Sequence, residues 1–226
     1  MQGIFITGTD TGVGKTYTAL CLIRTARVLG INITAMKPFE TGCSVSGRRS
    51  IPTPTDATKL MKACGTDKLA MVNQYRFTAP AAPYTAAQIE NKRISIDRVL
   101  SVYNTLSKQY DFVVVEGAGG LLVPITKNFS YADLAKELAL PVLIVSANKL
   151  GVINHTLLTV DYIANHRLGL LGVVLNNMTR KNDIAKKTNP HALSGLLGRM
   201  FLGEITFNNF RKDVALYKKI LRLTMF

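Results

Sequence analysis

Residues 8–16 combine three glycines with a lysine and a threonine, in the order Gly-Thr-Asp-Thr-Gly-Val-Gly-Lys-Thr. An apolar run precedes this segment and a helical pattern follows it, so the glycines fall between a strand and a helix. Backbone N–H groups at such a junction converge on one point, where the helix dipole also favours an anion. The Lys15 side chain would neutralise phosphates, and the Thr16 hydroxyl would join the ligands of a magnesium ion. The pattern predicts a loop that binds the phosphates of a nucleotide.

The spacing of this loop departs from the strict phosphate-binding motif. Gly8 lies six positions before Gly14 instead of five, and Gly12 does not restore the register. A glycine-rich turn that binds no ligand is therefore an alternative. The position of Gly-Lys-Thr at a junction between a strand and a helix favours the phosphate loop.

Two charged residues stand where later apolar runs end. Lys37 follows the run 32–36, and Glu116 follows the run 112–115 and precedes a glycine-rich segment. The strands of a parallel sheet end at one edge, so both residues would lie near the phosphate loop. A second cation there would stabilise a phosphoryl group in transfer, and a carboxylate suits Mg²⁺. For Lys37, the spacing alone leaves open an ordinary lysine at the end of a strand.

Three further polar residues occupy positions that allow more than one interpretation. Asp56 follows Pro54-Thr55, where an aspartate either caps a helix or joins Glu116 on a metal ion, and both readings stay open. Asn176 and Asn177 end a late apolar run of the kind that faces the base in nucleotide-binding folds. An asparagine amide can pair donor to acceptor with adenine.

Helices and strands must alternate along the chain to position these residues. The predicted strands are 2–7, 32–37, 111–116, 141–147, 170–176 and 201–205, most of them rich in Val, Ile and Leu as buried parallel strands are. The predicted helices are near 15–29, 55–63, 96–109, 131–139, 152–165 and 189–199. This order predicts an α/β fold with a doubly wound, mostly parallel sheet flanked by helices, of the P-loop NTPase type. The stretches 38–54 and 78–87 are expected to be loops over the active edge.

Composition is typical of one soluble domain that covers residues 1–226. The chain is 47% hydrophobic, and no apolar run approaches the length of a membrane span. The N-terminal residues enter the first strand directly and lack the basic region of a signal peptide. Three cysteines without metal-site spacing are expected to be free thiols. We therefore expect a cytoplasmic protein.

The positive net charge allows a different function. Lysine and arginine total 28 against 14 acidic residues, which invites a nucleic-acid-binding interpretation. The basic residues are scattered in pairs, such as Lys186-Lys187 and Lys218-Lys219, without an aromatic stripe or a known DNA-reading motif. Solvated faces that also attract anionic substrates are the favoured explanation, and we expect neither nucleic acid nor membrane as a partner.

Five motifs of the chain occur in an order that is hard to obtain by chance. They are the loop 8–16, Lys-Pro at 37–38, Glu-Gly-Ala-Gly-Gly at 116–120, Lys-Leu-Gly-Val-Ile-Asn-His at 149–155 with Thr-Leu-Leu-Thr at 156–159, and Leu-Gly-Glu-Ile at 202–205. Together they resemble the dethiobiotin synthetase family of biotin synthesis. The resemblance spans nearly the whole chain, and this family shares the extra residue of the phosphate loop.

The resemblance implies a reaction that consumes ATP with Mg²⁺. Enzymes of this family join carbon dioxide to 7,8-diaminopelargonate. One amine becomes a carbamate, ATP phosphorylates the carbamate to a carbamic-phosphoric anhydride, and the second amine closes a ureido ring with loss of phosphate. The products are dethiobiotin, ADP and phosphate.

The resemblance also implies the roles of individual residues. Lys15 and Lys37 would be catalytic, and Thr16, Asp56 and Glu116 would hold magnesium. Substrate contacts would come from Thr11 and Thr41, and from Gly151 and Asn154 at the start of a helix that the other subunit of a homodimer supplies. The nucleotide contacts would be Gly12, Val13, Gly14, Lys15, Thr16, Tyr17, Asp56, Glu116, Gly117, Ala118, Gly119, Asn176, Asn177, Thr206, Phe207 and Asn208.

Some residues depart from the family pattern. Gly12 stands where a glutamate is frequent, Thr206 stands where proline is usual, and the tail from Asn208 is basic. These differences place less weight on the adenine-side contacts than on the phosphate side. The alternative function is an ATPase switch of the chromosome- or septum-positioning type, which dimerises over ATP and binds DNA or membrane. Such switches usually carry a signature lysine near the start of the loop, where this chain has Gly8-Thr9-Asp10-Thr11.

Overall fold

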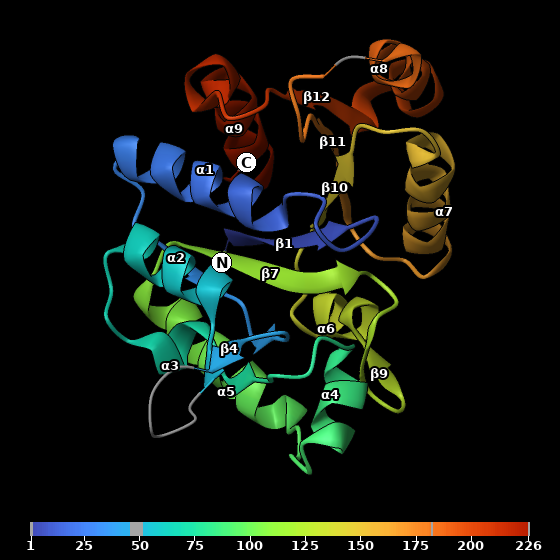
Figure 1. Ribbon diagram of the computed structural model, residues 1–226. Helices are drawn as coiled ribbons and strands as arrows, with labels where there is room; N and C mark the ends of the chain where they lie inside the picture. Colours follow the sequence, from blue (N-terminus) through green and yellow to red (C-terminus); the bar gives the residue numbers. More distant parts are fainter. Residues whose placement is uncertain (1, 46–51, 182, 226) are drawn as a thin grey trace.

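A parallel sheet forms the centre of the protein. The computed structural model describes residues 2–45, 52–181 and 183–225. Within these residues, the large sheet has six parallel strands in the order β12-β11-β10-β1-β7-β2 (Figure 1). The strands are β1 (Gln2–Gly8), β2 (Ile33–Met36), β7 (Phe112–Gly120), β10 (Val142–Ala147), β11 (Leu170–Asn176) and β12 (Phe201–Ile205). The α/β fold with a parallel sheet, which the sequence predicts, is confirmed.

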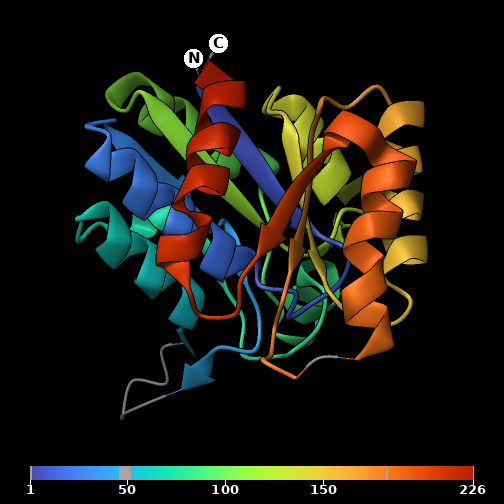
Figure 2. The same cartoon turned by 90° about the horizontal axis from the view of Figure 1, so that it is seen from above.

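Helices cover both faces of this sheet. On one face pack α1 (Lys15–Val28), α2 (Thr55–Cys64), the short α3 (Leu69–Val72) and α9 (Phe210–Met225), with α9 beside α1 (Figure 2). On the other face pack α4 (Pro83–Ile89), α5 (Ile96–Gln109), α6 (Tyr131–Glu137), α7 (Val152–Asn165) and α8 (Ile184–Leu197). A 3-10 turn at Gly198–Met200 and the short strands β3 (Phe39–Glu40), β4 (Ser44–Val45), β5 (Pro52–Thr53), β6 (Tyr75–Arg76), β8 (Pro124–Thr126) and β9 (Phe129–Ser130) complete the described elements.

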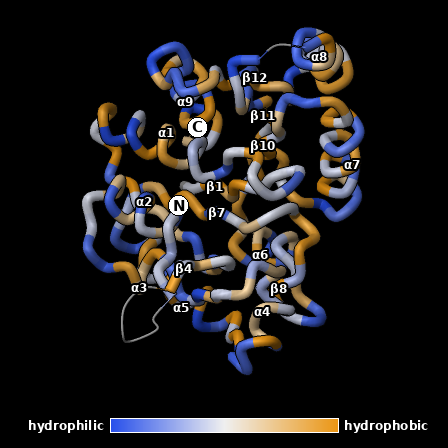
Figure 3. Tube along the Cα trace, viewed as in Figure 1, coloured by the Kyte–Doolittle hydropathy of each residue, from blue (hydrophilic) through white to orange (hydrophobic). Residues whose placement is uncertain are grey.

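The two cores follow from the alternation of side chains along each strand. In β7, Phe112 and Val114 contribute to the core beneath α1, whereas Val113 and Val115 contribute to the core beneath α5. Both faces of a central strand are thus apolar, as a doubly wound fold requires. Figure 3 shows hydrophobic residues along the central strands and hydrophilic residues on outer helices such as α8 and α9. Within the described part of the chain, no helix is both long and apolar enough to cross a membrane.

Helix α8 begins five residues before its predicted start at 189. The Asp183 side chain accepts a hydrogen bond of 2.8 Å from the Lys186 N–H and caps the helix there. Pro190 lies inside the helix and has no N–H for the Lys186 carbonyl, which accepts instead from Asn148 Nδ2 at 3.1 Å. Asn189 Nδ2 also donates to Asn148 Oδ1, at 2.9 Å. Asn148 thus supplies the donor that Pro190 lacks, and Asn189 holds Asn148 in place.

Other segments also differ from the sequence prediction. The expected loop 78–87 contains the start of α4, because Pro83 occupies the first turn, where a proline is tolerated. Helix α9 was not predicted, although its Tyr217, Ile220 and Leu221 are fully buried against the sheet. The expected loop 38–54 carries the short strands β3, β4 and β5, and its residues 46–51 lie outside the described residues.

Gly14 shows why the phosphate loop needs glycine. Its φ angle of 96° is in the left-handed region, and a Cβ atom built on it would lie 2.0 Å from Asn176 Nδ2. That amide donates a hydrogen bond of 2.9 Å to the Val13 carbonyl. The end of β11 therefore packs directly on the loop that precedes α1.

We predict that Gly14→Ala destabilises the protein more than Gly12→Ala. Gly12 also has a positive φ of 73°, but an added Cβ there meets nothing within 4 Å. Gly12→Ala should lower the free energy of unfolding by about 1 kcal/mol, from backbone strain alone. Gly14→Ala should lose about 1–3 kcal/mol more, because Asn176 must also move. Urea denaturation measures both losses. The explanation fails if they are equal, or if Asn176→Ala does not restore part of the loss in the Gly14→Ala background.

Candidate active site

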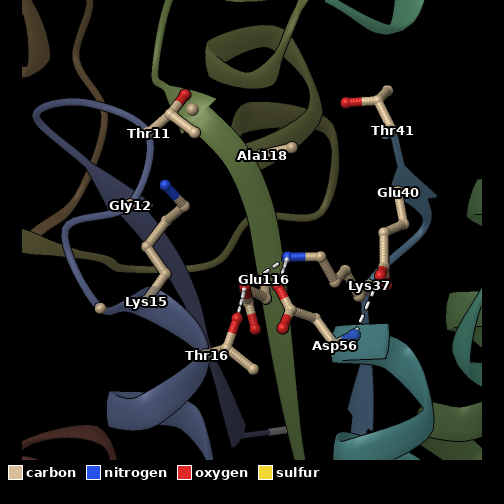
Figure 4. A pocket seen from close by; sticks show the side chains of 12 residues that line it. Thr11, Gly12, Lys15, Thr16, Lys37, Glu40, Thr41, Asp56, Glu116 and Ala118 are labelled. Carbon is tan, nitrogen blue, oxygen red and sulfur yellow. Dashed lines mark hydrogen bonds and ion pairs between the residues drawn. The ribbon is translucent and has the colours of Figure 1, made fainter. Parts of the chain in front are cut away.

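A cavity of about 270 Å³ lies at the carboxyl end of the sheet, between the phosphate loop, the ends of β2 and β7, and the start of α2 (Figure 4). Most of its polar walls come from residues that the sequence analysis selected. Its lining residues are Thr11, Gly12, Gly14, Lys15, Thr16, Lys37, Glu40, Thr41, Asp56, Glu116, Ala118 and Gly119. The fold therefore brings the lysine and threonine of the phosphate loop, the predicted metal ligands, and two of the predicted substrate residues, Thr11 and Thr41, to one place.

The pair formed by Lys37 and Glu116 lies at the base of this cavity. Met36, the last residue of β2, pairs with Val115 of β7, so the residues that follow them, Lys37 just after β2 and Glu116 within β7, lie side by side. Lys37 Nζ donates to Glu116 Oε1 and lies 3.5 Å from Asp56 Oδ2. Lys37 is 4% and Glu116 1% exposed. Two charges this deeply buried require each other.

Burial and neighbouring charges shift the pKa values of this cluster. Burial alone would lower the pKa of Lys37, but Glu116 and then Asp56 hold it above its ordinary value. Burial alone would raise the pKa of Asp56, but Lys37 and a hydrogen bond from Thr16 hold it below its ordinary value. Both groups are therefore charged at neutral pH.

Lys15 has a different environment. Its Nζ donates a hydrogen bond of 3.0 Å to the Asp10 carbonyl, so the side chain folds back over the phosphate loop. Burial, followed by repulsion from Lys37, lowers the pKa of Lys15 to about 8. No carboxylate of the described residues forms an ion pair with it at 4.0 Å or less. An anion placed in the loop would supply the negative partner that the Lys15 ammonium group lacks.

Two carboxylates and a hydroxyl meet beside Lys37. Thr16 Oγ1 donates to Glu116 Oε1 at 2.7 Å, and Asp56 lies in the first turn of α2. Asp56 does not cap α2, so that alternative interpretation is wrong: Pro54 is the N-cap residue, and the Asp56 side chain faces Lys37. Among the described residues, Glu116 Oε2 is buried without a hydrogen-bond partner.

This donor set fits a hard cation. Carboxylate and hydroxyl oxygens are the ligands that Mg²⁺ prefers, and the buried Glu116 Oε2 has no other hydrogen-bond partner among the described residues. In the described ranges, no group of three or more His, Cys, Asp or Glu side chains is placed to hold a metal. A cation here would therefore depend on Thr16 and on oxygens from a bound phosphate, as is usual for Mg²⁺.

The open end of the cavity has hydroxyl and small residues. Thr11, Thr41, Ala118 and Gly119 also line an adjoining cavity of about 350 Å³, whose other wall is the segment 80–83. Val13, Tyr17 and Gly117, which the sequence analysis also selected, line neither cavity. Val13 is buried in the core beneath α1, Tyr17 is on α1 with its pKa raised by burial to about 12, and a Cβ atom added at Gly117 would lie 3.4 Å from the Tyr131 ring.

The residues predicted to contact adenine do not line this cavity. Asn176 is 4% exposed, with its amide on the Val13 carbonyl. Asn177 bonds Asn148, Glu204 and the Ile205 carbonyl. Thr206, Phe207 and Asn208 form the turn between β12 and α9, where Thr206 bonds the buried Asp213 through both its N–H and its hydroxyl, at 2.8 Å each. The adenine contacts therefore stay a prediction.

Gly151 and Asn154 lie at the start of α7, outside both cavities. Gly151 is the N-cap residue with a φ of 88°, and Asn154 is exposed in the first turn. Lys149 Nζ lies 3.8 Å from Asp10 Oδ2 and links this turn to the phosphate loop. Gly151 and Asn154 could therefore contact only a substrate that lies outside these two cavities of their own subunit.

Sequence comparisons identify the family. Residues 2–210 match a family described as an AAA domain. The chain is 42% identical over 200 residues to the ATP-dependent dethiobiotin synthetase of Anaeromyxobacter sp. strain K, covering 88% of this chain and 87% of that protein. It is 40% identical over 186 residues to that of Methanocaldococcus jannaschii, covering 80% and 82%. The chain belongs to the dethiobiotin synthetase family.

Solved structures show that the family's fold is shared more widely. A plasmid partition protein from Borrelia burgdorferi matches with a TM-score of 0.59, 15% identity, and coverage of 98% of this chain and 96% of that chain. The MinC:MinD cell division complex of Aquifex aeolicus matches with a TM-score of 0.51, 14% identity, and coverage of 97% and 86%. At these identities the likeness shows a common P-loop fold and nothing about function. The plasmid partition protein and the cell division complex thus share the fold of this synthetase family member.

Two residues with structural roles, Glu40 and Asp213, are not among the predicted site residues; Asp213 had only a loose resemblance to a family glutamate near the ribose. Glu40 lines the cavity and bonds two backbone N–H groups of α2, although the sequence analysis used only its neighbours Lys37 and Thr41. Asp213 is buried and fixes Thr206. Neither contact has a local sequence signal, because each partner lies on a different element.

We predict strong coupling between Lys37 and Glu116 in stability. Lys37→Leu leaves a buried carboxylate unpaired and should lower the free energy of unfolding by about 3–5 kcal/mol. Adding Glu116→Gln removes that charge, so the double variant should be more stable than the sum of the two single losses predicts. Urea denaturation of the four proteins gives the coupling energy. A coupling below about 0.5 kcal/mol would show that the pair is not energetically important.

Proposed function

We propose that this protein is an ATP-dependent dethiobiotin synthetase whose chemistry takes place in the cavity between Lys15, Lys37 and Thr41. A carbamate formed from carbon dioxide and one amine of 7,8-diaminopelargonate attacks the γ-phosphorus of ATP, and ADP leaves. The second amine attacks the carbamate carbon of the resulting mixed anhydride. Phosphate leaves with the former carbamate oxygen, and the amine proton passes to solvent. The products are dethiobiotin, ADP and phosphate.

One observation carries this proposal: two buried lysines and three acidic side chains share a cavity with the phosphate loop and with Thr11 and Thr41. Phosphoryl transfer requires positioning and charge stabilisation more than covalent help from the protein. Lys15 would neutralise the terminal phosphates. Lys37, held at the cavity base by Glu116, would stabilise the charge that passes between carbamate and phosphate.

Mg²⁺ would be held in this cavity by Thr16, Asp56 and Glu116. The ion would withdraw negative charge from the phosphate oxygens. Support comes from the hard oxygen atoms of these residues and from the unpaired Glu116 Oε2. Thr11 and Thr41 offer hydroxyl groups on opposite walls of the adjoining cavity, where they would hydrogen-bond the diamine or its carbamate. The alkyl chain would then lie against apolar groups such as Ala118 and Pro80.

The activity test measures how ATP use depends on the substrates. With Mg²⁺, ATP, bicarbonate and 7,8-diaminopelargonate, the protein should release one phosphate per ureido ring, and ATP use should cease without the diamine. This coupling is expected because the attacking nucleophile is the carbamate and not water. ATP hydrolysis that DNA or lipid vesicles stimulate, and that the diamine does not, would instead indicate the alternative function, an ATPase switch.

A homodimer is part of the proposal. A third cavity lies between the phosphate loop, the β7–β8 turn and α7. It is lined by Leu122 and Leu158, among others, which are 58% and 61% exposed. Leu150, just before α7, is 86% exposed. Exposed leucines around a cavity suit a partner surface. The start of α7, at Gly151 and Asn154, would then reach the substrate bound in the partner subunit. The free N–H groups of this helix start would favour the carboxylate at the far end of 7,8-diaminopelargonate.

We predict complementation between two impaired variants, assayed at a diamine concentration below saturation. Lys37→Leu should lower turnover on the order of a hundredfold or more, because the lost interaction is with the transition state. Asn154→Glu should weaken substrate binding by repulsion at the α7 start. In a purified mixed dimer, one site has neither defect, so activity should recover to about half that of the unchanged protein. A mixed dimer as inactive as its parents would place both residues in a site made by one subunit.

A further inference from the structure

Glu40 joins two parts of the cavity that are distant in sequence. Its carboxylate accepts hydrogen bonds from the Asp56 N–H at 2.9 Å and from the Ala57 N–H at 2.8 Å. Glu40 is 7% exposed, so these bonds lie in a largely dry environment. A buried carboxylate that bonds two backbone N–H groups is held in a single orientation, and it holds those groups in return.

Helix α2 depends on this contact because it lacks a cap of its own. Its N-cap residue is Pro54, whose side chain has no polar atom to accept from the first N–H groups of the helix. Glu40 supplies the missing acceptors from β3, and its negative charge lies at the positive end of the helix dipole. The position of Asp56 is therefore fixed from outside its own helix.

Lys37 and Glu40 hold the same residue from one short segment. Lys37 Nζ lies 3.5 Å from the Asp56 carboxylate, while Glu40 accepts from the Asp56 backbone N–H (Figure 4). One contact orients the side chain and the other orients the backbone that carries it. Asp56 is thereby aimed at Thr16, whose hydroxyl donates to Glu116, and these three residues form the proposed cation site.

We propose that Glu40 is a positioning residue that sets the magnesium requirement of the enzyme through Asp56. The inference rests on the proposed function only where it places a cation beside Asp56. The anchoring of α2 by Glu40 stands on the geometry alone, so the two parts have separate tests.

The first test measures amide hydrogen exchange in the protein without nucleotide or metal. Glu40→Ala should speed exchange at the Asp56 and Ala57 N–H groups by about fivefold or more, because both lose their acceptor. Glu40→Gln keeps one acceptor oxygen and should fall between Glu40→Ala and the unchanged protein. Unchanged exchange in Glu40→Ala would overturn the anchoring role.

The second test is a double-mutant cycle on nucleotide affinity. Calorimetry gives the affinity for a non-hydrolysable ATP analogue with and without Mg²⁺, and the ratio of the two affinities is the magnesium enhancement. Glu40→Ala should reduce this enhancement by about tenfold, as is typical when a partner of a metal ligand is lost. In the Asp56→Asn background, Glu40→Ala should change it by less than about twofold, since its effect passes through Asp56.

Glu90→Ala is the matched control. The Glu90 carboxylate also accepts from two backbone N–H groups, those of Thr78 and Ala79, but it caps no part of α2. This variant should lose stability without a change in magnesium enhancement. An equal effect of Glu40→Ala with and without Asp56 would overturn the route through Asp56. If Asp56→Asn alone leaves the enhancement unchanged while exchange still responds to Glu40→Ala, the proposed cation role of Asp56 fails and only the anchoring of α2 remains.

Discussion

The arrangement of the cavity at the carboxyl end of the sheet depends on the buried charge pair between Lys37 and Glu116. Removing two charges from water is costly unless each has a partner in good geometry. Adjacent parallel strands meet this requirement, because Lys37 and Glu116 are the residues that follow the paired Met36 and Val115. The sheet register thus fixes a lysine and a carboxylate side by side at the base of the cavity, before any substrate is present.

Other elements converge on this pair through hydrogen bonds. Thr16 reaches it from the first turn of α1, and Asp56 reaches it from the first turn of α2, which Glu40 holds in place. The glycine at position 14 lets β11 pack against the phosphate loop, so the loop is fixed from its far side as well. Preorganised groups of this kind stabilise developing charge without moving during the reaction.

The sequence predicts those parts of the site that depend on strand order. Lys37 and Glu116 follow apolar runs, and parallel strands place their carboxyl ends together, so their proximity could be inferred. The contact of Glu40 with α2 could not, because its partners lie 16 and 17 residues away and the contact depends on how the loop between them folds. The early start of α8, five residues before the predicted 189, was also hidden, because the side chain that bonds the carbonyl facing Pro190 belongs to Asn148, 42 residues earlier. Helix α9 is missing from the sequence prediction, because its apolar residues, which pack on the sheet, alternate with many basic residues.

The central claim is that the cavity directs a carbamate oxygen, and not water, to the γ-phosphorus of ATP. Bicarbonate labelled with oxygen-18 tests this directly, in short incubations with ATP, Mg²⁺ and 7,8-diaminopelargonate in unlabelled water. Mass spectrometry of the released phosphate should show one oxygen-18 atom, because the former carbamate oxygen leaves with the phosphorus when the second amine closes the ring. Phosphate without the label, formed at the same rate as ADP, would show that water attacks ATP and would contradict the account.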